Sequence, residues 1–244
     1  MTILMEFMER HQKVALLFSA GKDSAACLKL LMPWIEQVTV VWCNPGRPFP
    51  EVVEYMERIR LEVPHFMVAL GEQPNWIAAN GWPADVVPFE ASRFGRRCAT
   101  DVKDVVPLVP AVECRNANMW EPAMHAVRAT GASGVIKGEK ATDIPLALPV
   151  QTVYEGREYF RPLWAWTDAD VMKFLDPKDW PPGYEEGLTG SLDCMTCTAW
   201  LARNPKRLRY LRVNHPKVFE EVAPVLRYMR ESSQAHVDRL EGLT

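Results

Sequence analysis

A short run of small and polar residues directly after an apolar run most constrains what this chain can fold into. Residues 14–18, VALLF, are predicted to form a buried strand, and residues 24–31 carry apolar side chains at helical spacing. Between them, residues 19–24 read SAGKDS, which predicts a tight loop. The amides of such a loop and the amino end of the following helix favour an anion. The sequence therefore predicts a strand, an anion-holding loop and a helix.

Short apolar runs and helical patterns continue to alternate along the chain. Residues 38–42 and 65–70 are predicted strands, and residues 51–63 and 121–130 have the spacing of amphipathic helices. This alternation predicts an α/β fold with a doubly wound, mainly parallel sheet, in which ligands bind at the carboxyl ends of the strands. The loop at residues 19–24 follows such an end.

Two parts are expected. Residues 1–175 are predicted to form the α/β domain, in which Thr167 caps a helix. Residues 176–244 are predicted to add a Pro- and Gly-rich segment with a CxxC motif and a helical C-terminal extension packed on the domain.

Charge and composition exclude several classes of protein. The 28 basic and 31 acidic side chains give a net charge of −3, so no global positive field points to a nucleic acid or an anionic membrane. No apolar run approaches a membrane span, and the amino-terminal residues lack the pattern of a signal peptide. A cytoplasmic location without a membrane partner is expected. In that compartment the 6 cysteines are predicted to be thiols, metal ligands or redox groups.

The loop does not match the common P-loop, because Lys22 is followed by Asp23 and the required spacing of glycines is missing. It resembles instead the SGGxDS pyrophosphate loop of the PP-loop superfamily. Ala20 stands where that pattern has its first glycine, which costs little only if this residue does not need a positive φ. The plain alternative is a helix that Asp23 or Ser24 merely caps.

Downstream segments resemble one branch of that superfamily, the phosphoadenosine phosphosulfate (PAPS) reductases, in the same order. The similar segments are VVWCNPGRPFPEVVEYMERI, RRCATDVKDVVPL, IKGEKATD, YFRPLWAWTDADVMKFL and DCMTCTAW, within residues 14–200. In IKGEKATD, Lys140 stands where arginine is usual. The resemblance implies an adenine nucleotide, either PAPS or ATP with magnesium. The implied nucleotide-binding residues are Ser19, Ala20, Gly21, Lys22, Asp23, Ser24, Gly138 and Lys140.

Cys194 and Cys197 form the CxxC motif, which suits two ligands of one metal or a redox pair. With Cys98 and Cys114 they could complete a tetrathiolate site. The resemblance favours a 4Fe-4S cluster; zinc and free thiols are the alternatives. Cys27 and Cys43 are predicted to be small buried hydrophobes.

Two reactions fit the resemblance. The first is reduction of PAPS to sulfite and adenosine bisphosphate, with a thioredoxin-like protein as partner. The family carries its nucleophilic cysteine in a C-terminal segment, and this chain has no cysteine after Cys197. The second is ATP-dependent adenylation and thiolation of a nucleic acid with a sulfur-donor protein. The predicted catalytic residues are Lys22, Asp23, Arg96, Arg97 and Lys103.

A third hypothesis is a nucleotide-binding partner subunit that has lost turnover, and a homodimer is also open. The basic run at residues 206–212 could contact a nucleic-acid backbone, but a solvated helix face is the preferred interpretation.

Overall fold

The computed structural model describes residues 2–98, 105–143 and 149–241. Its central six-stranded sheet has the order β3-β2-β1-β6-β8-β7. The strands are β1 (Val14–Phe18), β2 (Val38–Asn44), β3 (Phe66–Leu70), β6 (Gly134–Ile136), β7 (Gln151–Tyr154) and β8 (Arg157–Phe160). All neighbouring strands are parallel except β7 and β8. The predicted α/β fold with a mainly parallel sheet is confirmed.

The chain order creates a switch point beside β1. From β1 the chain builds outward through β2 and β3, and it then returns to place β6 on the other side of β1. The loops that leave β1 and β6 therefore diverge at the same edge of the sheet, and open α/β sheets bind their ligands at such a point.

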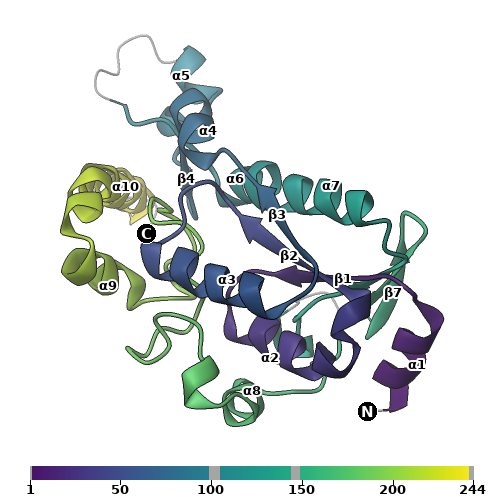
Figure 1. The fold of residues 1–244 in the computed structure, drawn as a ribbon. Coiled ribbons are helices and arrows are strands. Elements are labelled where there is room, and N and C mark those ends of the chain that lie inside the picture. Colours follow the sequence, from purple (N-terminus) through teal and green to yellow (C-terminus); the bar gives the residue numbers. More distant parts are fainter. Residues whose placement is uncertain (1, 99–104, 144–148, 242–244) are drawn as a thin grey trace.

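Helices cover both faces of the sheet (Figure 1). The helices are α1 (Thr2–Arg10), α2 (Lys22–Leu31), α3 (Pro50–Glu62), α4 (Gln73–Asn80), α5 (Gly95–Cys98), α6 (Ala111–Arg115), α7 (Glu121–Thr130), α8 (Asp168–Phe174), α9 (Arg207–Asn214) and α10 (Pro216–Glu241). In Figure 1, α2 and α3 lie on one side of the sheet and α7 lies on the other. No helix within the described ranges is long and apolar enough to cross a bilayer.

Alternating side chains of the strands build a core on each face. Val14, Leu16 and Phe18 of β1 pack with residues of α1, α2 and α3, whereas Ala15 and Leu17 pack with α7. Because successive side chains of a strand point to opposite faces, a fully apolar strand such as β1 must be covered on both. This requirement explains why residues 14–18 are apolar throughout.

The antiparallel hairpin of β7 and β8 was not predicted. Its turn residues Glu155 and Gly156 both have positive φ, 50° and 72°. Two such residues in succession suit the tight turn of a two-residue hairpin. The sequence signal is the Glu-Gly pair between residues rich in Val and Tyr.

Between β3 and α7 the chain forms only short elements. β4 (Trp82–Ala84) and β5 (Leu108–Pro110) make a small parallel sheet. A π-helical turn over Asn116–Trp120 joins α6 to α7. Turns of this kind occur often at functional sites, because they redirect side chains within a helix.

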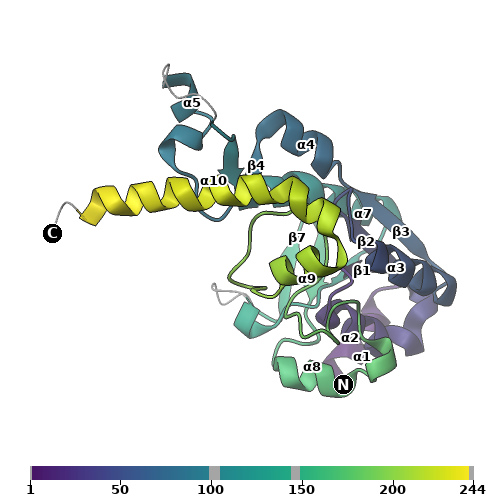
Figure 2. The same cartoon turned by 90° about the vertical axis from the view of Figure 1, so that its left-hand side faces the viewer.

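The predicted helical C-terminal extension consists of α9 and α10, and α10 runs as one long helix whose end projects from the body (Figure 2). The predicted cap of α8 is confirmed. The amide of Asp170 donates to the Thr167 hydroxyl oxygen at 3.2 Å, and the Thr167 amide donates to the Asp170 carboxylate at 2.8 Å.

Candidate functional site

The predicted loop leaves the carboxyl end of β1 and leads into α2. Ala20 has a φ of 57°, so this residue does adopt the left-handed conformation that glycine favours. The condition under which alanine would cost little is therefore not met. Gly21 is the N-cap of α2 and gives no side-chain hydrogen bond. The amides of the first helical turn are thus not capped by a side chain of the N-cap residue and face the switch point.

Gly138 brings the loop after β6 against the first turn of α2. A Cβ atom at Gly138 would lie 2.8 Å from the Asp23 carbonyl carbon and 3.0 Å from the Ser24 amide nitrogen. Only glycine allows this approach without a shift of backbone. The Ser24 hydroxyl donates to the Gly21 carbonyl at 2.8 Å, which closes the turn from inside.

Five charged side chains form a network beside the loop, which we call the lysine-carboxylate network: Lys22, Asp23, Lys140, Asp143 and Asp168. The Lys22 ammonium lies 2.8 Å from the Asp23 carboxylate and 2.9 Å from that of Asp168. The Lys140 ammonium lies 2.9 Å from Asp23, 2.9 Å from Asp143 and 3.3 Å from Asp168. The network ties the loops after β1 and β6 to the start of α8.

The network also sets the charge of its members. Burial alone would lower the pKa of Lys140, but the hydrogen bonds to Asp23 and Asp143 outweigh burial and raise that pKa. Burial alone would raise the pKa of Asp168, but the bond from Lys22 and the charge of Lys140 outweigh it and lower that pKa. Lys140 therefore stays cationic although it is buried.

A cavity of about 310 Å³ lies directly on the loop. Its lining includes four basic side chains, Lys22, Arg115, Lys137 and Arg203, against two acidic ones, Asp23 and Glu139. We call it the loop cavity. Its positive excess suits an anionic ligand at the amino end of α2.

Aromatic rings border this positive region. The Lys137 ammonium lies 4.4 Å from the centre of the Trp120 ring, and Arg115 lies over both Trp120 and Trp200 at 5.4 Å and 5.7 Å. Arg203 lies over Trp200 at 5.5 Å.

Burial lowers the pKa of Lys137, and the nearby Glu139 opposes this effect. Tyr184 accepts a hydrogen bond from the Lys22 amide at 3.2 Å and closes one side of the loop.

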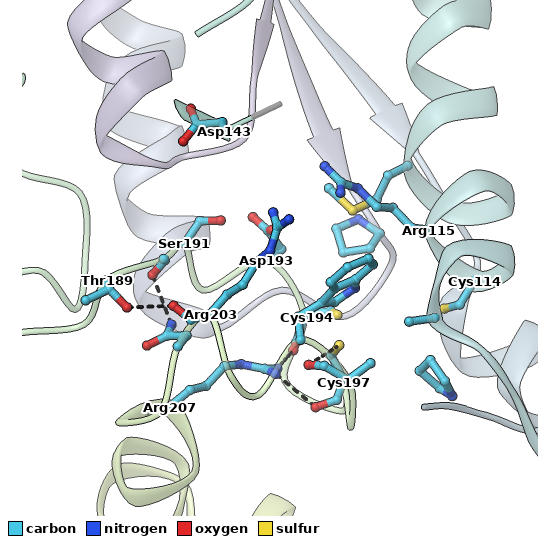
Figure 3. Close-up of a pocket in the computed structure, with 18 of the residues that line it drawn as sticks. Cys114, Arg115, Asp143, Thr189, Ser191, Asp193, Cys194, Cys197, Arg203 and Arg207 are labelled. Carbon is cyan, nitrogen blue, oxygen red and sulfur yellow. Dashed lines mark hydrogen bonds between the residues drawn. The ribbon is translucent and has the colours of Figure 1, made fainter. Parts of the chain in front are cut away.

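A second cavity of about 560 Å³, the thiol cavity, contains the cysteines (Figure 3). It shares Lys22, Asp23, Arg115 and Arg203 with the lining of the loop cavity and adds Cys114, Cys194 and Cys197. The two cavities therefore meet at the loop.

Cys194 and Cys197 lie on a turn that neighbouring side chains hold in place. The Cys197 amide donates to the Cys194 carbonyl at 3.4 Å. The buried Arg207 guanidinium donates to the carbonyl groups of both cysteines. The Gln73 amide donates to the Cys194 sulfur at 3.2 Å, and Thr196 donates to Gln73 at 3.0 Å. These contacts fix the backbone of the motif.

The three thiols of this cavity differ in acidity. The Cys194 thiol donates a hydrogen bond to the Cys197 sulfur, and this bond lowers the pKa of Cys197 to about 6. Burial opposes this shift, whereas the positive charge of Arg207 also lowers the pKa. The same hydrogen bond and burial raise the pKa of Cys194. Burial, then the nearby Cys197, raises the pKa of Cys114 to about 11.

The described residues do not assemble the four predicted metal ligands around one point. Cys98 is exposed on α5 and is absent from the lining of the thiol cavity, whereas the other three line it. Within the described ranges, no group of three or more His, Cys, Asp or Glu side chains is arranged to hold a metal ion. These residues do not fit a tetrathiolate cluster, and the cluster stays a prediction.

Two of the predicted catalytic residues lie elsewhere. Arg96 and Arg97 border a separate surface hollow with Ala79, Asn80 and Arg93, on the α5 region that projects from the body in Figure 1. Lys103 lies outside the described residues. The cavity linings bring together Ser19, Gly21, Lys22, Asp23, Ser24, Gly138, Cys114, Cys194 and Cys197.

Sequence reasoning did not select several residues of this site. Arg207 belongs to the run that was interpreted as a solvated face, but it is buried under the CxxC motif. Asp168 follows the predicted cap Thr167, and the structure shows its contacts with Lys22 and Lys140. No local sequence pattern marks the remaining site residues, Arg115, Arg203 and Tyr184.

Comparisons with known proteins point to one family. Residues 13–200 match the family model of the phosphoadenosine phosphosulfate reductase domain. The chain is 24% identical over 190 residues to the phosphoadenosine 5'-phosphosulfate reductase of Photobacterium profundum, covering 76% of this chain and 68% of that relative. It is 23% identical over 193 residues to the enzyme of the same name from Aliivibrio fischeri, with the same coverage.

A solved structure has the same fold. The crystal structure of PAPS reductase from Candida auris, in a phosphate complex, aligns with a TM-score of 0.51 and 16% identity. The alignment covers 79% of this chain and 86% of that one. With its family match, its switch-point loop and its mainly parallel sheet, the chain belongs to the phosphoadenosine phosphosulfate reductase family.

Proposed function

We propose that the protein binds PAPS and reduces it to sulfite with release of adenosine bisphosphate. The observation that carries this proposal is the junction of the two cavities, because it joins a positive loop at a helix amino end to a set of thiols. A substrate with an adenine nucleotide at one end and a sulfonate at the other needs both parts. Relatives named as PAPS reductases support the same choice.

The residues divide the work as follows. The amides of Asp23 and Ser24 in the first turn of α2 and the Lys137 ammonium bind phosphate oxygens, since both present positive charge to the loop cavity. Arg115 and Arg203 line both cavities, so they hold the anionic group that crosses the junction. They also neutralise the charge that develops on the departing phosphate. The thiols supply the electrons, and a dithiol protein of the thioredoxin class restores them.

The first test measures binding and product together. Calorimetric titration with PAPS should show tighter binding than with ATP and magnesium, and a reductant should then yield sulfite. Lys137→Ala should weaken binding of PAPS about tenfold, which corresponds to about 1.4 kcal/mol. Lys217→Ala, at an exposed position of α10, is the matched control and should bind as the unchanged chain does. Equal affinity of both lysine variants would contradict the role of the loop cavity.

The second candidate function is ATP-dependent adenylation in thiolation of a nucleic acid. The observation that favours it is the set of carboxylates beside the loop, Asp23, Asp143 and Asp168, because magnesium prefers carboxylate oxygens. Release of pyrophosphate from ATP in the presence of a nucleic-acid acceptor would support it. Binding of either nucleotide without any product would support the partner subunit that lacks turnover.

A further inference from the structure

We infer that Cys197 is the thiol that attacks the sulfonate sulfur of the bound nucleotide, and that Cys194 is the thiol that then releases sulfite. This inference rests on the proposed function and names the nucleophile that the proposed function requires. It assigns the CxxC motif a role as a reacting dithiol rather than as part of a metal site.

The first support is location. Cys197 and Cys194 line the same cavity as Lys22 and Asp23 of the loop, with Arg115 and Arg203 at the junction. A nucleotide whose phosphate lies on the amino end of α2 would extend its sulfonate into this cavity. Figure 3 shows Arg115 and Arg203 among the residues that line this cavity, where their positive charges would neutralise the sulfonate.

The second support is the unequal exposure of the two thiols. Cys194 is buried, and its sulfur accepts a hydrogen bond from Gln73. Cys197 is half-buried, and its sulfur lies 3.6 Å from the carbonyl oxygen of Ala199. Attack on an incoming substrate requires an accessible sulfur, which fits Cys197. Release of sulfite requires a second sulfur next to Cys197, and a buried sulfur such as that of Cys194 can serve in this step.

The third support is the rigid geometry of the motif. Arg207 binds both carbonyl groups of the motif, and the Cys197 amide donates to the Cys194 carbonyl. Each thiol is also the side-chain hydrogen-bond partner of the other, so the two sulfurs lie close together, which favours a bond between them. Arg207 and Gln73 are positioning residues in this scheme, since they act through the cysteines.

The fourth support is that the described residues do not bind these thiols in a common metal site. Cys98 lies on α5, outside the cavity, and no metal-holding group is found in the described part of the chain. Cys194 and Cys197 are therefore available to each other.

The two steps balance. The Cys197 thiol loses its proton to solvent and its sulfur attacks the sulfonate sulfur. The bond from that sulfur to the phosphate oxygen breaks, and adenosine bisphosphate leaves with the electron pair. Cys197 then carries an S-sulfonate. The Cys194 sulfur loses its proton to solvent and attacks the Cys197 sulfur, so sulfite leaves with the electron pair of the bond to Cys197. The two thiols are oxidised to a disulfide while the sulfur of the substrate is reduced, and an external dithiol resets the motif.

A single turnover without added reductant tests this scheme. The reduced full-length protein is mixed with PAPS under anaerobic conditions, and sulfite and the state of each cysteine are measured by peptide mass spectrometry. The unchanged chain should release one sulfite per chain and form the Cys194–Cys197 disulfide. Cys194→Ser should release no sulfite and retain an added SO₃ group on Cys197. Cys197→Ser should yield neither sulfite nor adduct, although calorimetry shows that it still binds PAPS.

Cys27→Ala is the matched control. The Cys27 side chain lies on α2, is fully buried in the hydrophobic core and does not line either cavity. It should release as much sulfite as the unchanged chain. Circular dichroism checks that every variant is folded, and Cys197→Ala replaces Cys197→Ser if the latter is not. Full sulfite release by a folded Cys197 variant, or an adduct on another cysteine, would overturn the assignment. Binding of PAPS while all thiols stay reduced would overturn only the assignment of the two cysteines. Failure of PAPS to bind would overturn the proposed function as well.

Discussion

At the scale of single residues, the backbone of the loop after β1 is held in a strained conformation. Ala20 holds a left-handed conformation at a φ of 57°, and it does so between the end of β1 and the N-cap of α2. For a residue with a Cβ atom this conformation costs about 1–2 kcal/mol. The surrounding structure must therefore supply this energy to keep the loop in place.

We expect Ala20→Gly to raise the free energy of unfolding by about 0.5–1 kcal/mol, because relief of strain exceeds the added freedom of glycine in the unfolded chain. Urea unfolding measures this difference. Ala25→Gly, in the interior of α2, is the matched control and should lower stability by about 1 kcal/mol. A loss of stability in both variants would show that Ala20 is not strained.

Gly138 provides the second prediction at this scale. In Gly138→Ala the new methyl group would meet the backbone of Asp23 and Ser24 at 2.8–3.0 Å, so the first turn of α2 must move. We expect nucleotide affinity to fall at least about tenfold and stability to fall by about 1–3 kcal/mol. Gly190→Ala should change stability little, since its nearest neighbour would lie at 3.4 Å. Urea unfolding of both variants separates the two cases, and titration of Gly138→Ala measures the loss of affinity.

At the scale of elements, local patterns predicted those parts whose environment is encoded nearby. The apolar runs at residues 14–18 and 38–42 correspond to β1 and β2, because a buried parallel strand needs an apolar sequence of its own. The run at residues 65–70 corresponds to β3, which lies at the edge of the sheet and leaves Val68 and Leu70 exposed. The loop at residues 19–24 could be predicted because its small and polar residues directly follow an apolar strand. By contrast, Arg207 is buried because two carbonyl groups of the CxxC turn receive its guanidinium, and no local pattern contains that contact.

The attachment of the C-terminal helices to α3 predicts a pH dependence. The Glu51 carboxylate accepts from the Tyr210 hydroxyl at 2.9 Å and pairs with the His215 imidazole at 2.8 Å. Burial opposes its ionisation, but the backbone amide, Tyr210 and His215 outweigh burial and lower the pKa of Glu51 from its ordinary value of 4.5. Its contribution to stability is therefore present above that value and is lost as the pH falls through the lower folded pKa.

Glu51→Gln should lower the free energy of unfolding by a constant amount near neutral pH, and the difference from the unchanged chain should shrink below pH 4.5. Urea unfolding at a series of pH values measures this. Glu54→Gln, at an exposed position of the same helix, should show no such trend. A difference that grows toward acid would contradict the sign of the shift.

At the scale of the whole molecule, one core crosses the predicted boundary at residue 175. Val171 and Leu175 belong to the same buried cluster as Leu192, Leu211 and Val222. The division into two parts stays a prediction about sequence, but a shared core couples their unfolding.

We expect a single unfolding transition with coincident midpoints by circular dichroism and by tryptophan fluorescence. Leu192→Ala, at a fully buried position, should lower the free energy of unfolding by about 2–5 kcal/mol and shift both midpoints together. Leu61→Ala is the matched control, because 79% of that residue is exposed. Two separate transitions would show that the parts fold independently.

The tryptophan rings beside the loop give the protein a built-in optical reporter. Trp120 and Trp200 line the two cavities, and the cations of Arg115, Lys137 and Arg203 lie over them. A phosphate or sulfonate that draws these cations away changes the electric field at the indole rings. Occupancy of the site should therefore be visible as a change in emission intensity or colour without any added label, and Trp120→Phe and Trp200→Phe would tell which end of the ligand has arrived.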